Sequence, residues 1–364
     1  MPRQSGSVNY PSQMLKSAIT TGIIAQNGKY CSEIDKFARQ IEKKGTVLNL
    51  ILFLIVGLVL VLVGADALVD GASALARKWG ISEFVIGLTI VALGTSAPEM
   101  VVSFISAIEG NSDIAAGNII GSNIFNTALI LGLTAVVSPI IITRANIKRD
   151  IPVNIAVTML LVFLGTRRSL FGFAHDGIGR IEGLLFLLLF AWYMWTSFRQ
   201  DQTDQAQDES GSTFGTARAV IYIIAGLAAL VFGGKMFVGN AESIAHILGW
   251  SDKFIAITIL AAGTSLPELA TSIVAAAKGK GQLALGNIIG SNTSNILLIL
   301  GGSALIHPLD MGGIAAADYA AISLCAIFLL ICAFTNRKNL LDRFEGSILL
   351  LIEVVYMGYL IYTL

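Results

Sequence analysis

The sequence predicts an all-α integral membrane protein whose ten transmembrane helices form two inverted-topology five-helix repeats. Of the 364 residues, 55% are hydrophobic and 13% are charged, whereas about a quarter of the residues in soluble globular proteins are charged. From residue 47 onward, most apolar stretches are long enough to cross a bilayer core of about 30 Å. Residues 87–126 and 256–295 align at a constant offset of 169 positions and are identical at 20 of 40 positions.

Polar segments divide the chain into four parts. Residues 1–46 are a polar, mixed-charge N-terminal tail, which we expect to be disordered or to form a short surface helix. Residues 47–199 make the first repeat and residues 218–364 the second, and residues 200–217 form a flexible cytoplasmic linker. Hydropathy predicts the ten spans at residues 47–76, 81–108, 113–138, 151–166, 178–198, 218–246, 253–277, 282–306, 314–334 and 344–363.

An odd number of spans in each repeat determines their relative orientation. Because five spans precede the second copy, that copy must insert upside down relative to the first. A further repeated motif supports this division. Arg180–Gly183 (Arg-Ile-Glu-Gly) recurs as Arg343–Gly346 (Arg-Phe-Glu-Gly), and each stands at the start of the last span of its repeat. With the N-terminus outside, most basic residues of the short loops lie on the cytoplasmic side. We therefore expect a multi-pass protein of the inner or plasma membrane with an external N-terminus, although the basic residues of the tail favour the opposite orientation.

The duplicated windows place the same polar residues on otherwise apolar helices. The shared motifs are Gly-Thr-Ser-x-Pro-Glu at Gly94–Glu99 and Gly263–Glu268, and Gly-Asn-Ile-Ile-Gly-Ser-Asn at Gly117–Asn123 and Gly286–Asn292. Pro98 has no amide hydrogen, so the carbonyl of Gly94 loses its helical donor and the backbone should open there. At membrane depth, such freed backbone groups must be satisfied by protein, water or a bound ion.

Glu99 and Glu268 are the strongest functional candidates. An ionisable residue in mid-span costs roughly 2.5–3.5 kcal/mol on insertion scales and marks a functional site by default. At 3.6 residues per turn, the threonine and serine of each first motif share a helix face with the glutamate. Carboxylate, hydroxyl and carbonyl oxygens are hard ligands that suit Na⁺ or Ca²⁺. The neighbouring spans add two polar stripes, Asn118, Ser122 and Asn126 in the first copy and Asn287, Ser291 and Asn295 in the second.

Other polar and small residues of these spans favour structural roles. We expect the glycines of the second motif to allow close helix packing, and its asparagines to cap helices or to bond between them as readily as to bind an ion. Asp66 and Asp70 align with Lys235 and Gly239 of the second copy. Because these charges are not matched, we interpret the two aspartates as helix-end or interhelical polar groups. The glycines in question are Gly117, Gly121, Gly286 and Gly290, and the asparagines are Asn118, Asn123, Asn287 and Asn292.

Charge arithmetic favours an exchanger. Two ionised glutamates hold about two negative charges, which one Ca²⁺ or competing Na⁺ ions would neutralise. Crossing with the site empty is costly in a low dielectric, which is the behaviour of an obligatory exchanger. A cation channel with the glutamates as a selectivity pair is the alternative from another class. The sequence has no basic patch for nucleic acid, and it lacks the G-x-S-x-G and H-E-x-x-H motifs of hydrolases.

The paired motifs resemble the α-repeats of the cation/Ca²⁺ exchanger superfamily, in particular its Na⁺/Ca²⁺ exchanger branch and the bacterial homologues. The resemblance extends from about residue 50 to residue 364. It implies an antiporter that exchanges Na⁺ for Ca²⁺ by alternating access, with helices two, three, seven and eight around the site and helices one and six sliding past them. It implies no cofactor beyond the transported ions, and no oligomeric state is predicted. Ca²⁺/H⁺ exchange is the alternative within this class.

The resemblance also implies a ligand set. Glu99, Glu268, Thr95 and Thr264 would bind Ca²⁺. The backbone carbonyls of Ala92 and Ala261 would bind Na⁺, and Asn126 would lie at the centre of the site. One position departs from the family, because Asn295 stands where many relatives, including the potassium-dependent branch, carry an aspartate; potassium coupling is therefore not expected. The hydroxyl ligands would be Ser96, Ser265, Ser122 and Ser291.

Overall fold

The computed structural model describes residues 28–172, 176–204, 215–251, 255, 259, 261–332, 334 and 339–363. The chain separates into one unit of residues Met1–Phe53 and a second of residues Leu54–Leu364. In the first unit, the described residues form the beginning of helix α2 (Gly28–Trp79), so a helix already starts within the expected tail. The predictions for residues 1–27, and for the part of the linker at 205–214, lie outside the described residues. The rest of the fold concerns the second unit.

The second unit is built almost entirely of helices, as expected for the all-α fold class. In the first repeat, α2 is followed by α3 (Glu83–Ile86), η1 (Gly87–Val91), α4 (Ala92–Thr95), α5 (Ala97–Ile108), α6 (Ser112–Phe125), η2 (Asn126–Leu131), α7 (Gly132–Val137), η3 (Asn146–Asp150), α8 (Ile151–Phe171) and α9 (Arg180–Asp204). The second repeat contains α10 (Thr216–Ile247), α12 (Ala261–Thr264), α13 (Leu266–Ala277), α14 (Gly281–Ser294), η5 (Asn295–Leu300), α15 (Gly301–Ile306), α16 (Ala316–Cys332) and α17 (Arg343–Tyr362). The segments labelled η are π-helical turns within longer helices.

Two short antiparallel ribbons join one repeat to the other. Strand β1 (Ile140–Ile141) pairs with β4 (Leu340–Leu341), and β2 (Gly177–Ile178) pairs with β3 (Leu309–Asp310). Strands β1 and β3 follow equivalent helices of the two repeats, and β4 and β2 precede equivalent helices. The two ribbons are therefore copies of each other with the repeats exchanged, as a pseudo-two-fold axis requires.

Helices α2 and α10, which open the two repeats, cross by direct backbone contact. A Cβ atom added at Gly64 would lie 2.8 Å from the carbonyl oxygen of Gly226, and one at Gly226 would lie 2.7 Å from that of Gly64. Gly57 and Gly233 approach each other in the same way one heptad away. Because residue numbers rise along one helix as they fall along the other, α2 and α10 run antiparallel. This pairing is the inverted topology expected from the sequence, made possible by small residues at the crossing.

The described residues contain six helices that are long and apolar enough to cross a membrane, and the bent pair Glu83–Thr95 and Ala97–Ile108 makes a seventh. Two shorter apolar helices, Leu266–Ala277 and Ala316–Cys332, lie within further expected spans. The chain is thus a multi-pass membrane protein, and the full count of ten crossings stays a prediction.

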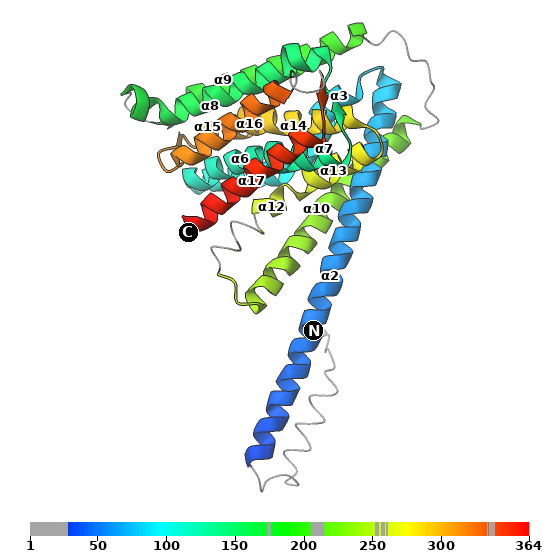
Figure 1. The fold of residues 1–364 in the computed structure, drawn as a ribbon, viewed down its shortest axis with the longest axis vertical. Helices are drawn as coiled ribbons and strands as arrows, with labels where there is room; N and C mark the ends of the chain where they lie inside the picture. Colours follow the sequence, from blue (N-terminus) through cyan, green and yellow to red (C-terminus); the bar gives the residue numbers. More distant parts are fainter. Residues whose placement is uncertain are drawn as a thin grey trace, which may run out of the picture. The chain divides into compact units, whose positions relative to one another are not determined.

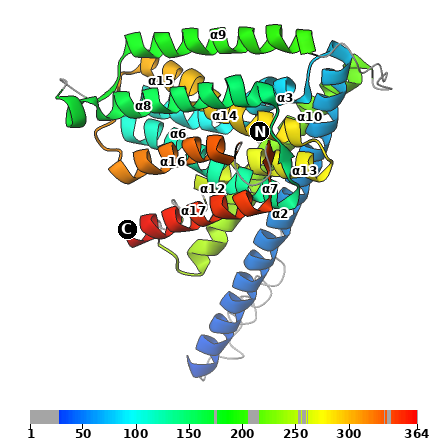
Figure 2. The same ribbon diagram turned by 45° about the horizontal axis from the view of Figure 1, so that its top comes forward.

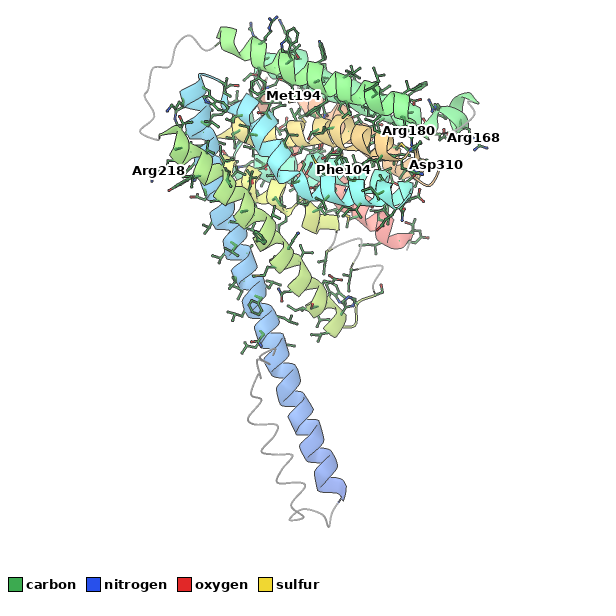
Figure 3. All side chains as sticks on the ribbon, turned by 180° about the vertical axis from the view of Figure 1, so that it is seen from behind. Phe104, Arg168, Arg180, Met194, Arg218 and Asp310 are labelled. Carbon is green, nitrogen blue, oxygen red and sulfur yellow. The ribbon has the colours of Figure 1, made fainter. Side chains whose placement is uncertain are left out.

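The central helices are those that carry the second motif. In the 18-residue apolar window of Gly281–Ile306, 94% is buried, and in that of Ser112–Val137, 72%, whereas the windows of the outer candidate spans are 17–28% buried. Figures 1 and 2 both show α6 and α14 between α9 on one side and α17 on the other. Phe104 of α5, labelled in Figure 3, closes the packing against Gly302 of α15, where an added Cβ would meet its ring at 2.9 Å. The duplicated polar residues consequently lie in the interior, away from lipid.

The proline-containing motifs interrupt their helices as predicted. Helix α4 ends at Thr95, Ser96 leaves the helical conformation at φ −78° and ψ 9°, and α5 begins at Ala97 with a bend of 51°. In the second repeat, α12 ends at Thr264 and α13 begins after Ser265, which has nearly the same backbone angles. Each proline stands in the first turn of the new helix, where its missing N–H has no helical acceptor to lose.

The glycines of the second motif differ between the repeats. A Cβ at Gly286 would lie 2.2 Å from the carbonyl oxygen of Phe84, and one at Gly290 would lie 2.4 Å from that of Leu88. At Gly117 and Gly121, an added Cβ would meet no described residue within 4 Å. The predicted packing role is therefore confirmed for the second repeat, whereas no described residue makes the equivalent contact in the first.

This difference predicts unequal effects of the same substitution. Gly286→Ala should lower the unfolding temperature, because overpacking against an unyielding backbone costs about 1–3 kcal/mol. Gly117→Ala is the matched control in the other repeat and should leave the unfolding temperature near that of the wild type. Thermal unfolding of the purified proteins in detergent measures both. Equal destabilisation by the two variants would contradict the asymmetry.

Candidate functional site

Each helix break places a glutamate in the first turn of a new helix. Glu99 lies in the first turn of α5, and Glu268 lies in the first turn of α13. The N-terminal end of a helix carries partial positive charge, which favours a nearby carboxylate by about 0.3–1 kcal/mol. Both side chains are buried at 1% exposure. The break thus brings a carboxylate into the interior and supplies part of its stabilisation.

The two carboxylates are held by crossed hydrogen bonds. The Ser96 hydroxyl donates to Oε1 of Glu268 at 2.8 Å, and the Ser265 hydroxyl donates to Oε1 of Glu99 at 3.0 Å. Each glutamate therefore accepts from the serine of the opposite repeat. The carboxylates are also close enough to repel each other electrostatically. The site belongs to the junction of the repeats and to neither repeat alone.

Further hydroxyl groups continue this arrangement. Oγ of Ser96 lies 3.0 Å from Oγ of Ser291. The Ser291 hydroxyl also bonds to the carboxylate of Glu268, so both serines serve the same glutamate. Thr95 also faces Glu268, and Thr264 faces Glu99, again across the repeat boundary.

A layer of asparagines beneath the carboxylates also crosses between the repeats. The Asn123 amide nitrogen donates to the backbone carbonyl of Asn292 at 3.1 Å. The Asn295 amide nitrogen donates to Oδ1 of Asn123 at 2.9 Å, and that of Asn292 donates to Oγ1 of Thr127 at 2.8 Å. Asn123 and Asn292 therefore join α6 to α14, which is the interhelical role that the sequence left open for them.

Asn118 and Asn287 also join helices within one repeat, and Oδ1 of Asn287 lies 3.2 Å from the Thr95 hydroxyl of the other repeat. The amide nitrogen of Asn118 donates to the hydroxyl of Ser103, and that of Asn287 donates to the hydroxyl of Ser272, both at 3.0 Å. Asn118 also donates to the backbone carbonyl of Glu99 at 3.2 Å. These two bonds of Asn118 hold α6 against α5, the helix that carries Glu99.

Four buried oxygens of the predicted site residues have no hydrogen-bond donor. Among the described residues, Oε2 of Glu99, Oε2 of Glu268, Oδ1 of Asn126 and Oδ1 of Asn295 are all buried and unpartnered. A buried polar atom left without a partner costs about 1–3 kcal/mol. Two carboxylate and two amide oxygens are the ligand chemistry that Na⁺ and Ca²⁺ prefer. The arrangement can therefore bind a hard cation between the repeats.

The remaining predicted ligands occupy different positions. Ser122 is buried on α6 and borders a cavity beside the site. The carbonyl of Ala92 accepts the backbone N–H of Ser96 at 3.0 Å and lies 3.3 Å from the Thr95 hydroxyl. Ala261 begins α12, and its side-chain surroundings lie outside the described residues. The twelve predicted site residues thus fall on the two broken helices, on α6 and α14, and on the π-helical turns that follow them.

Two polar residues near the site were missed in the sequence. Thr127 has no counterpart that could reveal it, because the second copy has Ile296 at the equivalent position. Glu353 could have been found, since a carboxylate within the last apolar span is the same signal that marked Glu99.

Asp66 and Asp70 form ion pairs away from the glutamates. Nζ of Lys278 lies 2.6 Å from Asp66 and 2.8 Å from Asp70, and Lys280 lies 3.4 Å from Asp70. Partial burial lowers the pKa of Lys278, but the hydrogen bonds and charges of the two aspartates outweigh this effect and raise it overall. The lysine stays charged at neutral pH, and the predicted interhelical role of the aspartates is confirmed.

Known proteins share this architecture along nearly the whole chain. Residues 49–199 and 218–362 match the family model described as sodium/calcium exchanger protein. CaxA of Alkalimonas amylolytica is 39% identical over 323 residues, which cover 86% of this chain and 98% of CaxA. The sodium/calcium exchanger MaX1 of Methanosarcina acetivorans is 33% identical over 344 residues, which cover 85% of this chain and 98% of MaX1. The solved structure of the sodium-calcium exchanger NCX_Mj soaked with 10 mM Na⁺ and zero Ca²⁺ matches with a TM-score of 0.74 and 31% identity, covering 86% of this chain and 99% of that one.

The site geometry predicts that the glutamates control stabilisation by Ca²⁺. For the wild type, Ca²⁺ at 100 times its Kd should raise the free energy of unfolding by about 2.7 kcal/mol. Removing one charge partner from a buried site costs about 2–5 kcal/mol, or at least roughly 30-fold in Kd. Glu99→Gln or Glu268→Gln should therefore reduce this stabilisation to less than about a third.

Thermal unfolding of purified protein, with and without Ca²⁺, measures this effect. Asp70→Asn removes a carboxylate outside the site and should keep the full Ca²⁺ shift. If both glutamine variants kept that shift, the four oxygens would not be the cation site.

Proposed function

Because the chain belongs to the sodium/calcium exchanger protein family, we propose that it exchanges Na⁺ for Ca²⁺ across the membrane as a secondary antiporter. The single observation that carries the proposal is the set of four unpartnered buried oxygens, two from each repeat. The proposed ion-binding residues are those predicted from the sequence, with Glu99 and Glu268 as the charged ligands. No cofactor is proposed beyond the transported ions.

Charge balance supports a divalent ion competing with monovalent ions. Two carboxylates in the interior can be neutralised by one Ca²⁺ or by Na⁺ ions sharing the same oxygens. The crossed serine bonds hold only one oxygen of each carboxylate, which leaves Oε2 of Glu99 and Oε2 of Glu268 for the cation. An empty site is the costly state, so return across the membrane requires a bound ion.

The helices around the site support alternating access. Helix α10 lies against both broken helices: Leu227 contacts the position of Gly94, and Val238 contacts that of Gly263. A rigid movement of α10 with its antiparallel partner α2 would therefore reach both glutamate-bearing segments. Rocking of one bundle against another around a fixed midplane site is the general mechanism of inverted-repeat transporters.

The neutral amide of Asn295 supports exchange that does not depend on K⁺. Its nitrogen donates to Asn123 and its oxygen is free of donors, so the side chain offers a ligand without adding charge. A Ca²⁺/H⁺ antiporter is the second candidate, because buried carboxylates also accept protons. For location, we propose the inner or plasma membrane with the N-terminus outside, on the basis of the basic loops.

The first functional prediction concerns the driving ion. Proteoliposomes loaded with Na⁺ and diluted into Na⁺-free medium should take up ⁴⁵Ca²⁺, since each tenfold Na⁺ gradient supplies about 1.4 kcal/mol per ion. Vesicles loaded with choline are the control and should show little uptake, and so should vesicles with a pH gradient alone. Uptake that follows the pH gradient and ignores Na⁺ would favour the Ca²⁺/H⁺ antiporter instead. Flux without any counter-ion would favour a channel.

A second prediction concerns Asn295. Replacing external K⁺ by choline at constant ionic strength should leave the initial Ca²⁺ uptake of the wild type unchanged. Asn295→Asp adds a titratable group that is neutral when protonated, like the amide. The variant should therefore resemble the wild type at low pH and diverge from it as pH rises. A wild-type protein that requires K⁺ would contradict the assigned role of the amide.

A further inference from the structure

A third glutamate is buried in the last helix and takes no part in the site described above. Glu353 of α17 is 5% exposed, and its Oε2 has no hydrogen-bond partner among the described residues. The thiol of Cys325 and the phenol of Tyr356 interact with it electrostatically. The Tyr356 hydroxyl donates to Asp318 at 2.9 Å, so it is not available to Glu353. No basic side chain among the described residues faces this carboxylate, so a cation entering beside it would balance its ionised form.

Glu353 borders a cavity that reaches the predicted ion site. The cavity has a volume of about 110 Å³, and water occupies about 30 Å³ per molecule in the liquid, so a few waters or a partly hydrated cation fit. Ser122, a predicted ligand, and Asn118, which binds the backbone of Glu99, line its other wall. The described lining residues include no Lys, Arg or His: Gly117, Asn118, Gly121, Ser122, Phe125, Ala262, Glu353, Tyr356, Met357 and Leu360.

The described residues around this cavity differ between the repeats. Gly117 and Gly121 face it, whereas the equivalent glycines of the second repeat are packed against backbone. The residue equivalent to Glu353 in the last helix of the first repeat is Phe190, which packs into the core. Among the described residues, the carboxylate and the cavity therefore occur together beside α6, and the first repeat has no carboxylate at the equivalent place.

We propose that Glu353, together with the hydroxyl of Ser122, forms a second cation site in which Ca²⁺ or Na⁺ binds on its way between solution and the central glutamates. The inference rests on the proposed function and adds a residue to it. The bound ion keeps part of its water, since the cavity offers one carboxylate and few other oxygens. The site is consequently of lower affinity than the central one, and it raises the local cation concentration beside Ser122.

Transport kinetics test this role through the KM for Ca²⁺. Glu353→Gln should raise the KM for ⁴⁵Ca²⁺ uptake in Na⁺-loaded proteoliposomes while kcat changes little. Because Coulomb energy scales with ionic charge, loss of the carboxylate charge costs Ca²⁺ twice the binding energy that it costs Na⁺. If the external Na⁺ concentration that half-inhibits uptake rises twofold, the KM for Ca²⁺ should therefore rise about fourfold. Glu353→Asp keeps the charge and should stay near the wild type. Glu345→Gln is the matched control on the same helix, where the carboxylate caps the backbone at Asp342.

A binding measurement separates this site from the central one. In purified protein carrying both Glu99→Gln and Glu268→Gln, weak ⁴⁵Ca²⁺ binding should remain and should disappear when Glu353→Gln is added. Absence of residual binding, or residual binding that survives Glu353→Gln, would overturn the inference, as would an unchanged Ca²⁺ KM. The binding experiment decides the inference even if the wild type transports a different pair of cations, whereas failure of Na⁺-driven uptake alone would reject only the proposed function.

Discussion

The structure depends on one constraint, which is that two buried carboxylates must be held without a basic partner. Glu99 and Glu268 receive no ion pair from the described residues; each accepts instead from a serine of the opposite repeat. That arrangement needs both helices to break beside their glutamates, so that a helix N-terminus faces each carboxylate. It also needs the two breaks to lie face to face, which the antiparallel crossing of α2 and α10 and the exchanged ribbons bring about.

The duplicated scaffold carries unequal halves. Helix α14 packs so closely against the second helix of the first repeat that Gly286 and Gly290 leave no room for a methyl group. No described residue lies as close over Gly117 and Gly121 of α6, and these two glycines border a cavity. Internal repeats related by a pseudo-two-fold axis can exchange such open and closed sides when one bundle moves. The residues that differ between the two copies therefore determine how closely each central helix is packed, which the shared motifs alone do not.

The sequence predicted what local chemistry and duplication determine. Pro98 predicted the helix break, the offset of 169 positions predicted the inverted repeat, and the intramembrane carboxylates Glu99 and Glu268 predicted the centre of the site. It did not predict the partners of the asparagines, because these bonds join residues more than 160 positions apart. Nor did it predict the surroundings of Gly117, which depend on which helix packs opposite. Glu353 differs from these residues because it belongs to no repeated motif, since the equivalent residue of the first repeat is Phe190.

The asparagine layer bears on the history of the chain. Asn292 donates to Thr127, and the residue equivalent to Thr127 in the second repeat is Ile296, which has no acceptor. Two copies of the second repeat could not rebuild this layer, because both Asn292 amides would lose their partner in the interior, at about 1–3 kcal/mol each. The second half therefore fits the first half better than it would fit a second copy of itself. Divergence after the duplication has made the two halves complementary and no longer interchangeable.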